Sequence, residues 1–211
     1  MIVSFSRNFA FVAVPRTGTH AVRTALRPHL APSDWEQCTR YERRLCPAPA
    51  IAAIGHGHLT AAELRSALIP GLWERMFSFA FVREPLARFA SAFLLLHRDH
   101  LPGDAAAVRQ RMKDTLRDPE QMAHILYRPQ RDFVLDREGS RLVSLIARHD
   151  RLAAELEAIC ERLELPPPQV ERVNAARYPE GFEPDEELRA LCEHLYALDY
   201  EWFETLGEAG A

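Results

Sequence analysis

The 211-residue sequence has few cysteines and no long apolar segment, and each shortage excludes a class of protein. Without C-x-x-C spacing or a nearby histidine set, the cysteines predict neither a zinc site nor a disulfide scaffold. Unpatterned cysteines suit a reducing compartment, so we expect a cytoplasmic protein. The chain also shows no apolar anchor and no charged leader with a cleavage site, which argues against a transmembrane segment or secretion. The four cysteines are Cys38, Cys46, Cys160 and Cys192.

The sequence also lacks an excess of positive charge, internal repeats and Gly/Ser-rich linkers. A net charge of −4 implies no broad basic face, so nucleic acid is not an expected partner. With 47% hydrophobic residues the chain can bury a full core, and residues 1–211 are predicted to form a single domain. Arg40, Arg43 and Arg44 form a local cluster in a Pro-rich connection, which we interpret as a solvated loop rather than a contact for an acidic substrate.

The most informative stretch follows the apolar run 76–82, which is short, rich in aromatic residues and typical of a buried strand. Pro85 opens a predicted helix that continues to Leu96. Arg83 then sits at the carboxyl end of the strand, and Arg88 and Ser91 share a helical face three residues apart. Two guanidinium groups and a hydroxyl in this arrangement can close on one anion, although an ordinary surface cap fits the same pattern.

A second strand–loop–helix segment lies near the N-terminus. The apolar run 8–14 ends at the loop 15–20 (Pro-Arg-Thr-Gly-Thr-His), and an amphipathic pattern follows. A tight loop that opens into a helix N-terminus exposes backbone N–H groups and the positive end of the helix dipole to a phosphate or sulfate. The loop has one glycine and no Lys-Ser/Thr pair, so it is not a Walker A motif, and ATP with magnesium fits poorly. A Pro-Gly turn capped by threonine is the alternative.

Together the two segments resemble the binding elements of sulfotransferases that use 3′-phosphoadenosine 5′-phosphosulfate (PAPS). In that family a loop of the type P-K-T-G-T/S-T/S holds the 5′-phosphosulfate, and R-x-P-x-x-R-x-x-S-x-F/Y holds the 3′-phosphate. The first element resembles residues 15–20, and every fixed position of the second is matched by Arg83, Pro85, Arg88, Ser91 and Phe93.

The resemblance implies a role for each matched residue. Arg83 and Ser91 would contact the 3′-phosphate, and Arg88 would bind or support that site. The residues that would bind the phosphosulfate are Pro15, Arg16, Thr17, Gly18, Thr19 and His20. Two of these depart from the family pattern, because Arg16 replaces the usual lysine with a planar fork and His20 replaces the final serine or threonine.

A Gly-His-Gly-His segment, residues 55–58, narrows the resemblance to one branch of the family. We expect the apolar stretch 50–54 before it to end a strand, and Thr60 with Glu63 predicts a capping box at the start of a helix. The segment resembles heparan sulfate and uronyl 2-O-sulfotransferases, in which the second histidine is the presumed general base. That role would fall to His58, with His56 orienting the loop or contacting the acceptor. His-x-His is also a metal-ligand spacing, and either histidine can be a cap; no metal is predicted.

Alternating strands and helices predict an α/β protein with a central, mostly parallel sheet flanked by helices, and the resemblance implies the P-loop-like sulfotransferase fold. Downstream we expect a turn at Glu138–Gly139, a strand over 142–146 and helices over 150–163 and 185–198, with residues 166–168 (Pro-Pro-Pro) as a rigid spacer. Asn174-Ala-Ala and the segment 198–203 weakly match the family's closing elements.

The segment 102–128 is the least informative. One predicted helical stripe contains Val108, Met112, Thr115 and Leu116, and a second contains Met122, Ile125 and Leu126; both are typical of core. Since insertions here shape the acceptor pocket in the family, the candidate acceptor contacts are Gln121, His124, Tyr127 and Arg131.

Sulfuryl transfer sets the expected mechanism. A neutral imidazole with an ordinary pKa near 6.5 can take the proton of an acceptor hydroxyl, which is the role expected of His58. Arg16 and the loop N–H groups would stabilise charge on the departing phosphate, without a metal. The expected acceptor is a carbohydrate or a small molecule. A catalytically silent nucleotide-binding protein of the same fold and, less favoured, a nucleotide-dependent kinase are the alternatives, and the sequence does not predict the oligomeric state.

Overall fold

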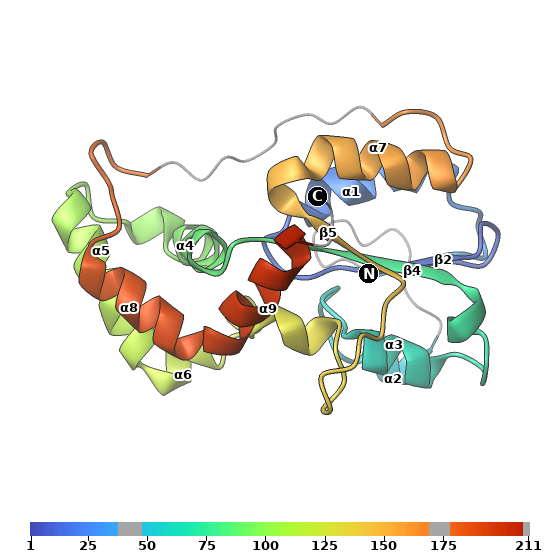
Figure 1. Cartoon of the computed structure of the whole chain (residues 1–211), viewed down its shortest axis with the longest axis horizontal. Coiled ribbons are helices and arrows are strands. Elements are labelled where there is room, and N and C mark those ends of the chain that lie inside the picture. The colour runs from blue at the N-terminus through green and yellow to red at the C-terminus, as the bar shows by residue number, and fades with distance from the viewer. Residues whose placement is uncertain (38–47, 169–177, 209–211) are drawn as a thin grey trace. The chain divides into compact units, whose positions relative to one another are not determined.

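A computed structural model describes residues 1–37, 48–168 and 178–208, and its strands are short apolar runs that pair in one five-stranded sheet (Figure 1). The strands are β1 (Ile2–Ser4), β2 (Phe9–Val12), β3 (Trp35–Glu36), β4 (Phe77–Val82) and β5 (Leu145–Arg148). The helices are α1 (Thr19–Leu26), α2 (Pro49–Ala52), α3 (Ala61–Ala67), α4 (Pro85–Leu96), α5 (Ala105–Arg117), α6 (Pro119–Met122), α7 (Leu152–Arg162), α8 (Glu186–Leu195) and α9 (Ala197–Glu208). Short 3₁₀ helices cover Arg27–His29, Trp73–Arg75, Arg98–His100, Gln130–Phe133 and His149–Arg151.

The sheet has the order β3-β1-β2-β4-β5. Strand β4 pairs in parallel with both β2 and β5, in registers that place Val12 opposite Ala80 and Val82 opposite Arg148. Strand β1 is antiparallel to both of its neighbours, so within the described residues it is the one strand that runs against the other four. The predicted α/β class with a mostly parallel sheet is confirmed. Because β2, β4 and β5 point the same way, the residues that follow them emerge at one edge of the sheet.

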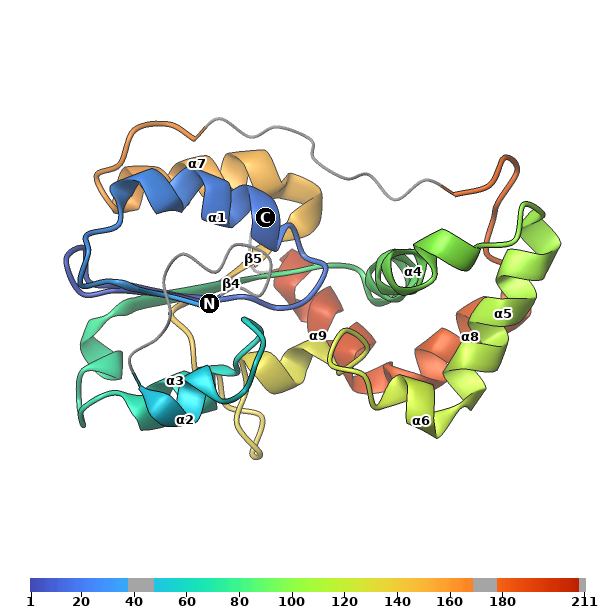
Figure 2. The ribbon, with the colours of Figure 1, turned by 180° about the vertical axis from the view of Figure 1, so that it is seen from behind.

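Helices cover both faces of this sheet. Figures 1 and 2 show α1 and α7 on one face and α2 and α3 on the other. The aromatic residues Phe9, Phe11, Phe79 and Phe81 are fully buried, and the core that contains them also includes side chains from α1 and α7. Aliphatic and aromatic side chains buried on this scale are the main source of stability in such a layer.

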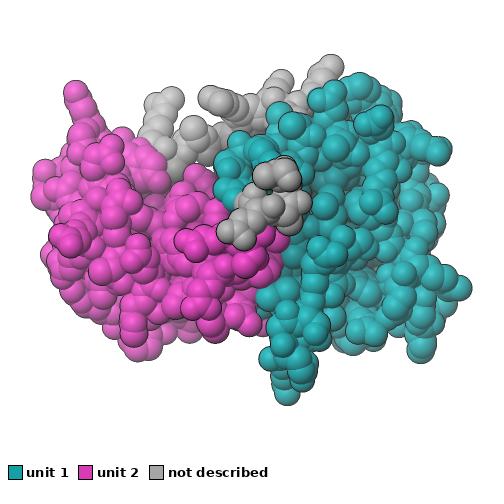
Figure 3. All heavy atoms as spheres, in the orientation of Figure 1, with its two compact units in different colours: residues 1–82, 132–173 teal, residues 83–131, 174–211 magenta. Residues whose placement is uncertain are grey.

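The described residues divide into two compact units (Figure 3). Unit 1 consists of residues 1–82 and 132–173 and contains the whole sheet; unit 2 consists of residues 83–131 and 174–211. Unit 2 is built from α4, α5, α6, α8 and α9 around its own apolar core. The predicted stripe of α5 is confirmed, since Val108, Met112, Thr115 and Leu116 are all buried. An ion-pair network joins α5 to the start of α8 through Lys113, whose Nζ lies 2.6 Å from Glu187 Oε2.

One strand prediction is wrong, and the bounds of a second are shifted. The stretch 50–54 does not end a strand, because residues 49–52 form α2, with Pro49 fixing φ at the first turn and alanines favouring the helix. The strand predicted at 142–146 begins three residues later, at Leu145. The amide of Leu142 bonds to Val134 O, and the backbone N–H of Ser144 bonds to the hydroxyl of Ser78. These residues are therefore paired outside the regular β4–β5 ladder.

The helix predicted over 185–198 is also interrupted. Helix α8 ends before Tyr196 and α9 begins after it. Helix propensity along the sequence does not predict this break. The phenol of Tyr196 donates to Tyr127 O (2.6 Å), a contact 69 residues away in sequence. The second predicted stripe is split as well, because α6 ends at Met122. The cluster at Arg40, Arg43 and Arg44, the segment at Asn174 and the cysteines Cys38 and Cys46 lie outside the described residues.

Candidate active site

The loop that follows β2 has the backbone geometry of an anion site. Arg16 and Gly18 both adopt left-handed conformations (φ 65° and 84°), and α1 begins directly afterwards at Thr19. The N–H groups of Thr17, Gly18 and Thr19 have no acceptor among the residues that the structure describes. Successive N–H groups in such a turn, at a helix N-terminus, bind anions through hydrogen bonds and the helix dipole. The predicted strand–loop–helix arrangement is therefore present.

Internal contacts hold this loop in place. The Thr17 side chain is fully buried and its hydroxyl donates to Val14 O (2.9 Å). A Cβ at Gly18 would lie 2.9 Å from Leu152 Cδ2 and 3.3 Å from His149 Cδ2, so the start of α7 packs directly against the loop. Thr17 can thus offer an anion its backbone N–H, while its hydroxyl proton stays within the loop. Pro15 is buried, and Arg16, Thr19 and His20 are partly buried.

The Gly-His-Gly-His segment joins this loop in unit 1. His58 Nδ1 lies 2.7 Å from Ala13 O, three residues before Arg16. A carbonyl oxygen only accepts hydrogen bonds, so Nδ1 carries the proton and Nε2 keeps its lone pair. The predicted capping box follows at once: Thr60 accepts from the N–H of Glu63, and the Glu63 carboxylate accepts from the N–H of Thr60. This cap fixes the start of α3 and with it the end of the histidine segment.

The environment of His58 keeps its imidazole neutral. Burial lowers the pKa of His58 to about 3, partly offset by the bond to Ala13 O, and the positive charges of the Met1 amino group and Arg23 lower it further. The ordinary pKa near 6.5 expected from the sequence is therefore wrong for the protein without ligands. His58 is unprotonated at neutral pH, as a proton acceptor must be, but its basicity is low.

His56 faces its own loop. Its Nδ1 accepts from the backbone N–H of His58 (3.2 Å), and its carbonyl accepts from Gln37 Nε2 (2.8 Å). The two imidazole centroids are 6.2 Å apart. These contacts favour an orienting role for His56.

Gly57, between the histidines, is the anchor of the segment. Its carbonyl accepts from the Met1 nitrogen (2.5 Å) and from Arg23 Nη2 (3.3 Å), and the Arg23 nitrogen also reaches Gln37 O (3.3 Å). A Cβ at Gly57 would lie 2.1 Å from Gln37 O, which real structures do not allow. Sequence reasoning missed Arg23; its signal was a charged residue beside Val22 on the apolar face of α1.

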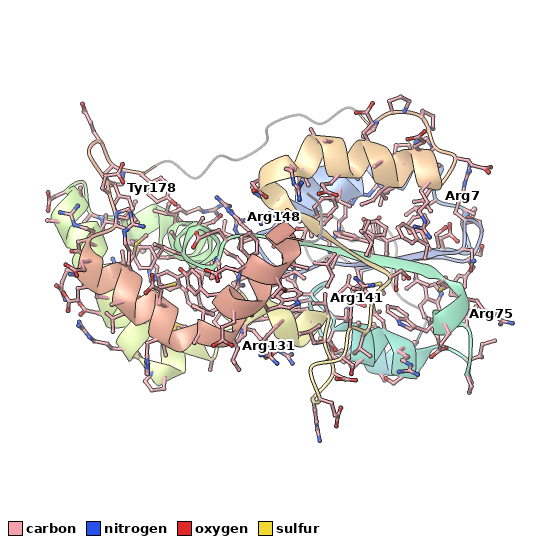
Figure 4. The ribbon with its side chains drawn as sticks, in the orientation of Figure 1. Arg7, Arg75, Arg131, Arg141, Arg148 and Tyr178 are labelled. Atoms are coloured by element: carbon pink, nitrogen blue, oxygen red, sulfur yellow. The ribbon has the colours of Figure 1, made fainter. Side chains whose placement is uncertain are left out.

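The elements matched to the 3′-phosphate motif lie in unit 2. Arg83 directly follows β4, and within the described residues its guanidinium has no hydrogen-bond or ion-pair partner. Burial lowers its pKa, and the nearby Tyr178 (labelled in Figure 4), which stacks on Phe182 at 4.8 Å, raises it. Glu84 caps α4 by accepting from the N–H groups of Leu86 (3.0 Å) and Ala87 (2.6 Å). The N–H groups of Leu86 and Ala87 are therefore already bonded to Glu84, and an anion beside Arg83 would be bound by side chains instead.

Arg88 and Ser91 are deeply buried in unit 2. The Arg88 side chain is fully buried, and its guanidinium donates to the carbonyls of Leu126 (3.1 Å) and Arg128 (2.9 Å). These contacts hold the turn after α6 against α4, and they favour the supporting role for Arg88. Ser91 is 3% exposed.

Sequence reasoning also missed two buried polar residues beside Arg83. The side-chain amide of Gln130 bonds to the backbone N–H and to the carbonyl of Arg83, at 3.0 and 2.6 Å. The carboxylate of Asp199, in the first turn of α9, accepts from the N–H of Gln130 (2.8 Å) and of Arg131 (2.9 Å). Asp199 lies in the segment 198–203, which weakly matches a closing element of the family, but the contacts span 47 and 69 residues, so no local pattern predicts them.

The candidate acceptor residues differ in accessibility. Gln121 and His124 are exposed, Arg131 (labelled in Figure 4) is partly buried, and Tyr127 is 2% exposed in the core of unit 2. Tyr127 is thus shielded from any acceptor in this structure. Among the described residues no group of three or more His, Cys, Asp or Glu side chains is placed to hold a metal ion. No described helix is both long and apolar enough to cross a membrane.

Comparison with protein families gives a match over most of the chain. The model of the sulfotransferase family (Sulfotransfer_2) matches residues 56–204, a range that contains both histidines and the Arg83–Ser91 element and begins after the loop at 15–20. Comparison with curated proteins and with solved structures gives no match. The chain belongs to the sulfotransferase family, and the resemblance noted in the sequence is confirmed at that level.

Proposed function

We propose that the protein transfers the sulfuryl group of PAPS to a hydroxyl group of a carbohydrate or small-molecule acceptor. The observation that carries this proposal is the loop at 15–20, with three N–H groups that have no acceptor in the described chain and with Arg16 beside them. Membership of the sulfotransferase family supports the same activity. PAPS carries anionic groups at two positions, the 5′-phosphosulfate and the 3′-phosphate, so the proposal requires two anion-binding elements. Arg83 would belong to the second, which binds the 3′-phosphate.

His58 is the proposed general base. The bond from Nδ1 to Ala13 O leaves Nε2 as the proton acceptor. Binding of an anionic donor at the loop would raise the pKa of His58, because a nearby negative charge favours the imidazolium form. Basicity would then increase when donor is bound, and His56 would keep the segment oriented through its bond to the His58 N–H.

Arg16 and the loop N–H groups are proposed to stabilise the leaving phosphate. Negative charge grows on that oxygen as the bond to sulfur breaks, so donors already aimed at it lower the barrier more than they stabilise the bound ground state. The product nucleotide would be adenosine 3′,5′-bisphosphate. Arg83, with Ser91, would bind its 3′-phosphate, supported by Arg88. We further propose a cytoplasmic location, since Cys160 and Cys192 are free thiols.

Thermal unfolding with different nucleotides tests the proposal. A ligand at 100 times its Kd stabilises the folded state by about 2.7 kcal/mol. Adenosine 3′,5′-bisphosphate should raise the Tm, whereas ATP with magnesium should not. A shift with ATP and magnesium alone would support a kinase instead. A shift with the bisphosphate, combined with no transfer of label from PAPS across an acceptor screen, would favour a silent nucleotide-binding protein.

A further inference from the structure

A side-chain amide takes the place of a strand partner at Arg83. Gln130 is fully buried; its Oε1 accepts from the Arg83 N–H (3.0 Å) and its Nε2 donates to the Arg83 carbonyl (2.6 Å). The amide of glutamine carries one acceptor and two donors, so it can pair with both backbone groups of one residue, as a neighbouring strand does. The backbone of Arg83 is thereby held on both sides of its Cα atom.

Gln130 is itself fixed. It opens a 3₁₀ helix, Gln130–Phe133, whose first two N–H groups donate to the Asp199 carboxylate at 2.8 and 2.9 Å. Asp199 is 1% exposed. Charge-assisted bonds to a buried carboxylate are stronger than neutral ones and stay rigid in the absence of water. A continuous series of bonds therefore runs from α9 through Gln130 to the backbone of Arg83.

This arrangement leaves the guanidinium of Arg83, which has no hydrogen-bond or ion-pair partner among the described residues, as the part of Arg83 that can bind a ligand. On the other side, Glu84 caps α4 and Pro85 restricts the backbone of Glu84, so the chain directly after Arg83 is also held in place. Arg83 needs to lose only side-chain freedom when it binds an anion. Such preorganisation raises affinity without adding a contact to the ligand.

We infer that Gln130, held by Asp199, is a positioning residue that sets the selectivity of Arg83 for a 3′-phosphate. This inference rests on the proposed function. Gln130 would touch no ligand atom; it would act through the backbone of Arg83 and would matter only for ligands that Arg83 contacts.

A calorimetric double-mutant cycle tests the inference without knowledge of the acceptor. Adenosine 3′,5′-bisphosphate and adenosine 5′-phosphate are titrated into the full chain carrying Gln130→Met, Arg83→Ala, both changes or neither. Methionine keeps the shape of glutamine and removes its bonds. Gln130→Met should weaken the bisphosphate by about three- to tenfold, the scale of coupling between neighbouring residues. It should leave the monophosphate unchanged, and in the Arg83→Ala background it should change neither affinity.

Tyr196→Phe is the matched control. It removes another buried hydrogen bond to a backbone carbonyl of unit 2, from the phenol to Tyr127 O, without touching Arg83. It should lower the Tm and leave the preference for the bisphosphate intact. If Gln130→Met does not fold, Asp199→Asn, which keeps the shape and weakens the acceptor, should give the same selective loss.

Three results would overturn the inference. They are an unchanged preference for the bisphosphate in the folded Gln130 or Asp199 variant, an equal loss for both nucleotides, and a loss that persists in the Arg83→Ala background. Failure of the proposed function looks different, because the wild-type protein would then show no preference between the two nucleotides, and the inference would fall with it.

Discussion

Lowering the pH from 7 to 5 should destabilise the folded protein through His58. Burial lowers the pKa of this imidazole to about 3 in the folded state, whereas an imidazole in the unfolded chain has a pKa near 6.5. Between these two values the unfolded state binds more protons than the folded state. The stability that the neutral His58 imidazole contributes is therefore fully present above about pH 6.5. It is lost progressively as the pH falls towards the pKa of His58 in the folded state.

The size of the effect follows from the two pKa values. Each pH unit well below the unfolded pKa removes about 1.4 kcal/mol, so a change from pH 7 to pH 5 should remove about 2 kcal/mol of the free energy of unfolding. His58→Gln is the matched variant, because its amide can still donate to Ala13 O and cannot titrate. The pH dependence of stability should be shallower in this variant by the same amount.

Denaturant unfolding at pH 7 and pH 5 measures this difference, and NMR of the ring nitrogens measures its cause. The spectra should show the Nδ1–H tautomer of His58 at both pH values, and its pKa should rise when adenosine 3′,5′-bisphosphate is added. An imidazole that titrates near 6.5 in the free protein, or one that carries its proton on Nε2, would refute the reasoning.

Three further predictions concern the loop and the histidine segment. Gly57→Ala should destabilise the protein by about 1 to 3 kcal/mol through overpacking against Gln37 O. Gly103→Ala, with open space around its Cβ position, should not destabilise it. Equal midpoints of urea unfolding for the two variants would argue against the close approach of Gln37 O to Gly57. Gly18→Ala and Gly139→Ala share a left-handed backbone that costs about 1 to 2 kcal/mol, but only the first should also abolish nucleotide binding, because its Cβ meets Leu152. Arg16→Lys should keep substantial turnover and Arg16→Ala should lose turnover more than donor affinity; steady-state kinetics in which both are equally inactive would show that charge at this position is not what matters.

Elements whose ends are marked by local chemistry could be predicted from the sequence. The apolar run before Arg83 and the proline after it define the β4–α4 boundary, and the Thr60–Glu63 pair defines the start of α3. These features depend on interactions within about one helical turn, so periodicity and capping residues are sufficient. The strand prediction for 50–54 failed because a short run of alanine and isoleucine fits a short helix as well as a strand.

The contacts that give the candidate site its chemistry are long-range. His58 is oriented by Ala13, 45 residues away, and Arg83 is held by Gln130, 47 residues away. A sequence shows which groups can titrate or donate, but burial and distant carbonyls decide the pKa of His58 and the orientation of Arg83. The family motif therefore predicted the candidate site residues, while their partners emerged only from the fold.

The most direct test of the account is the fate of labelled PAPS in the presence of an acceptor. The wild-type protein should form a sulfate ester on the acceptor hydroxyl and one equivalent of adenosine 3′,5′-bisphosphate, and His58→Gln should lose turnover by about 10² to 10⁴ while it retains affinity for the bisphosphate. Label that never leaves PAPS with any acceptor, although the nucleotide binds, would contradict the assignment of sulfuryl transfer to this site.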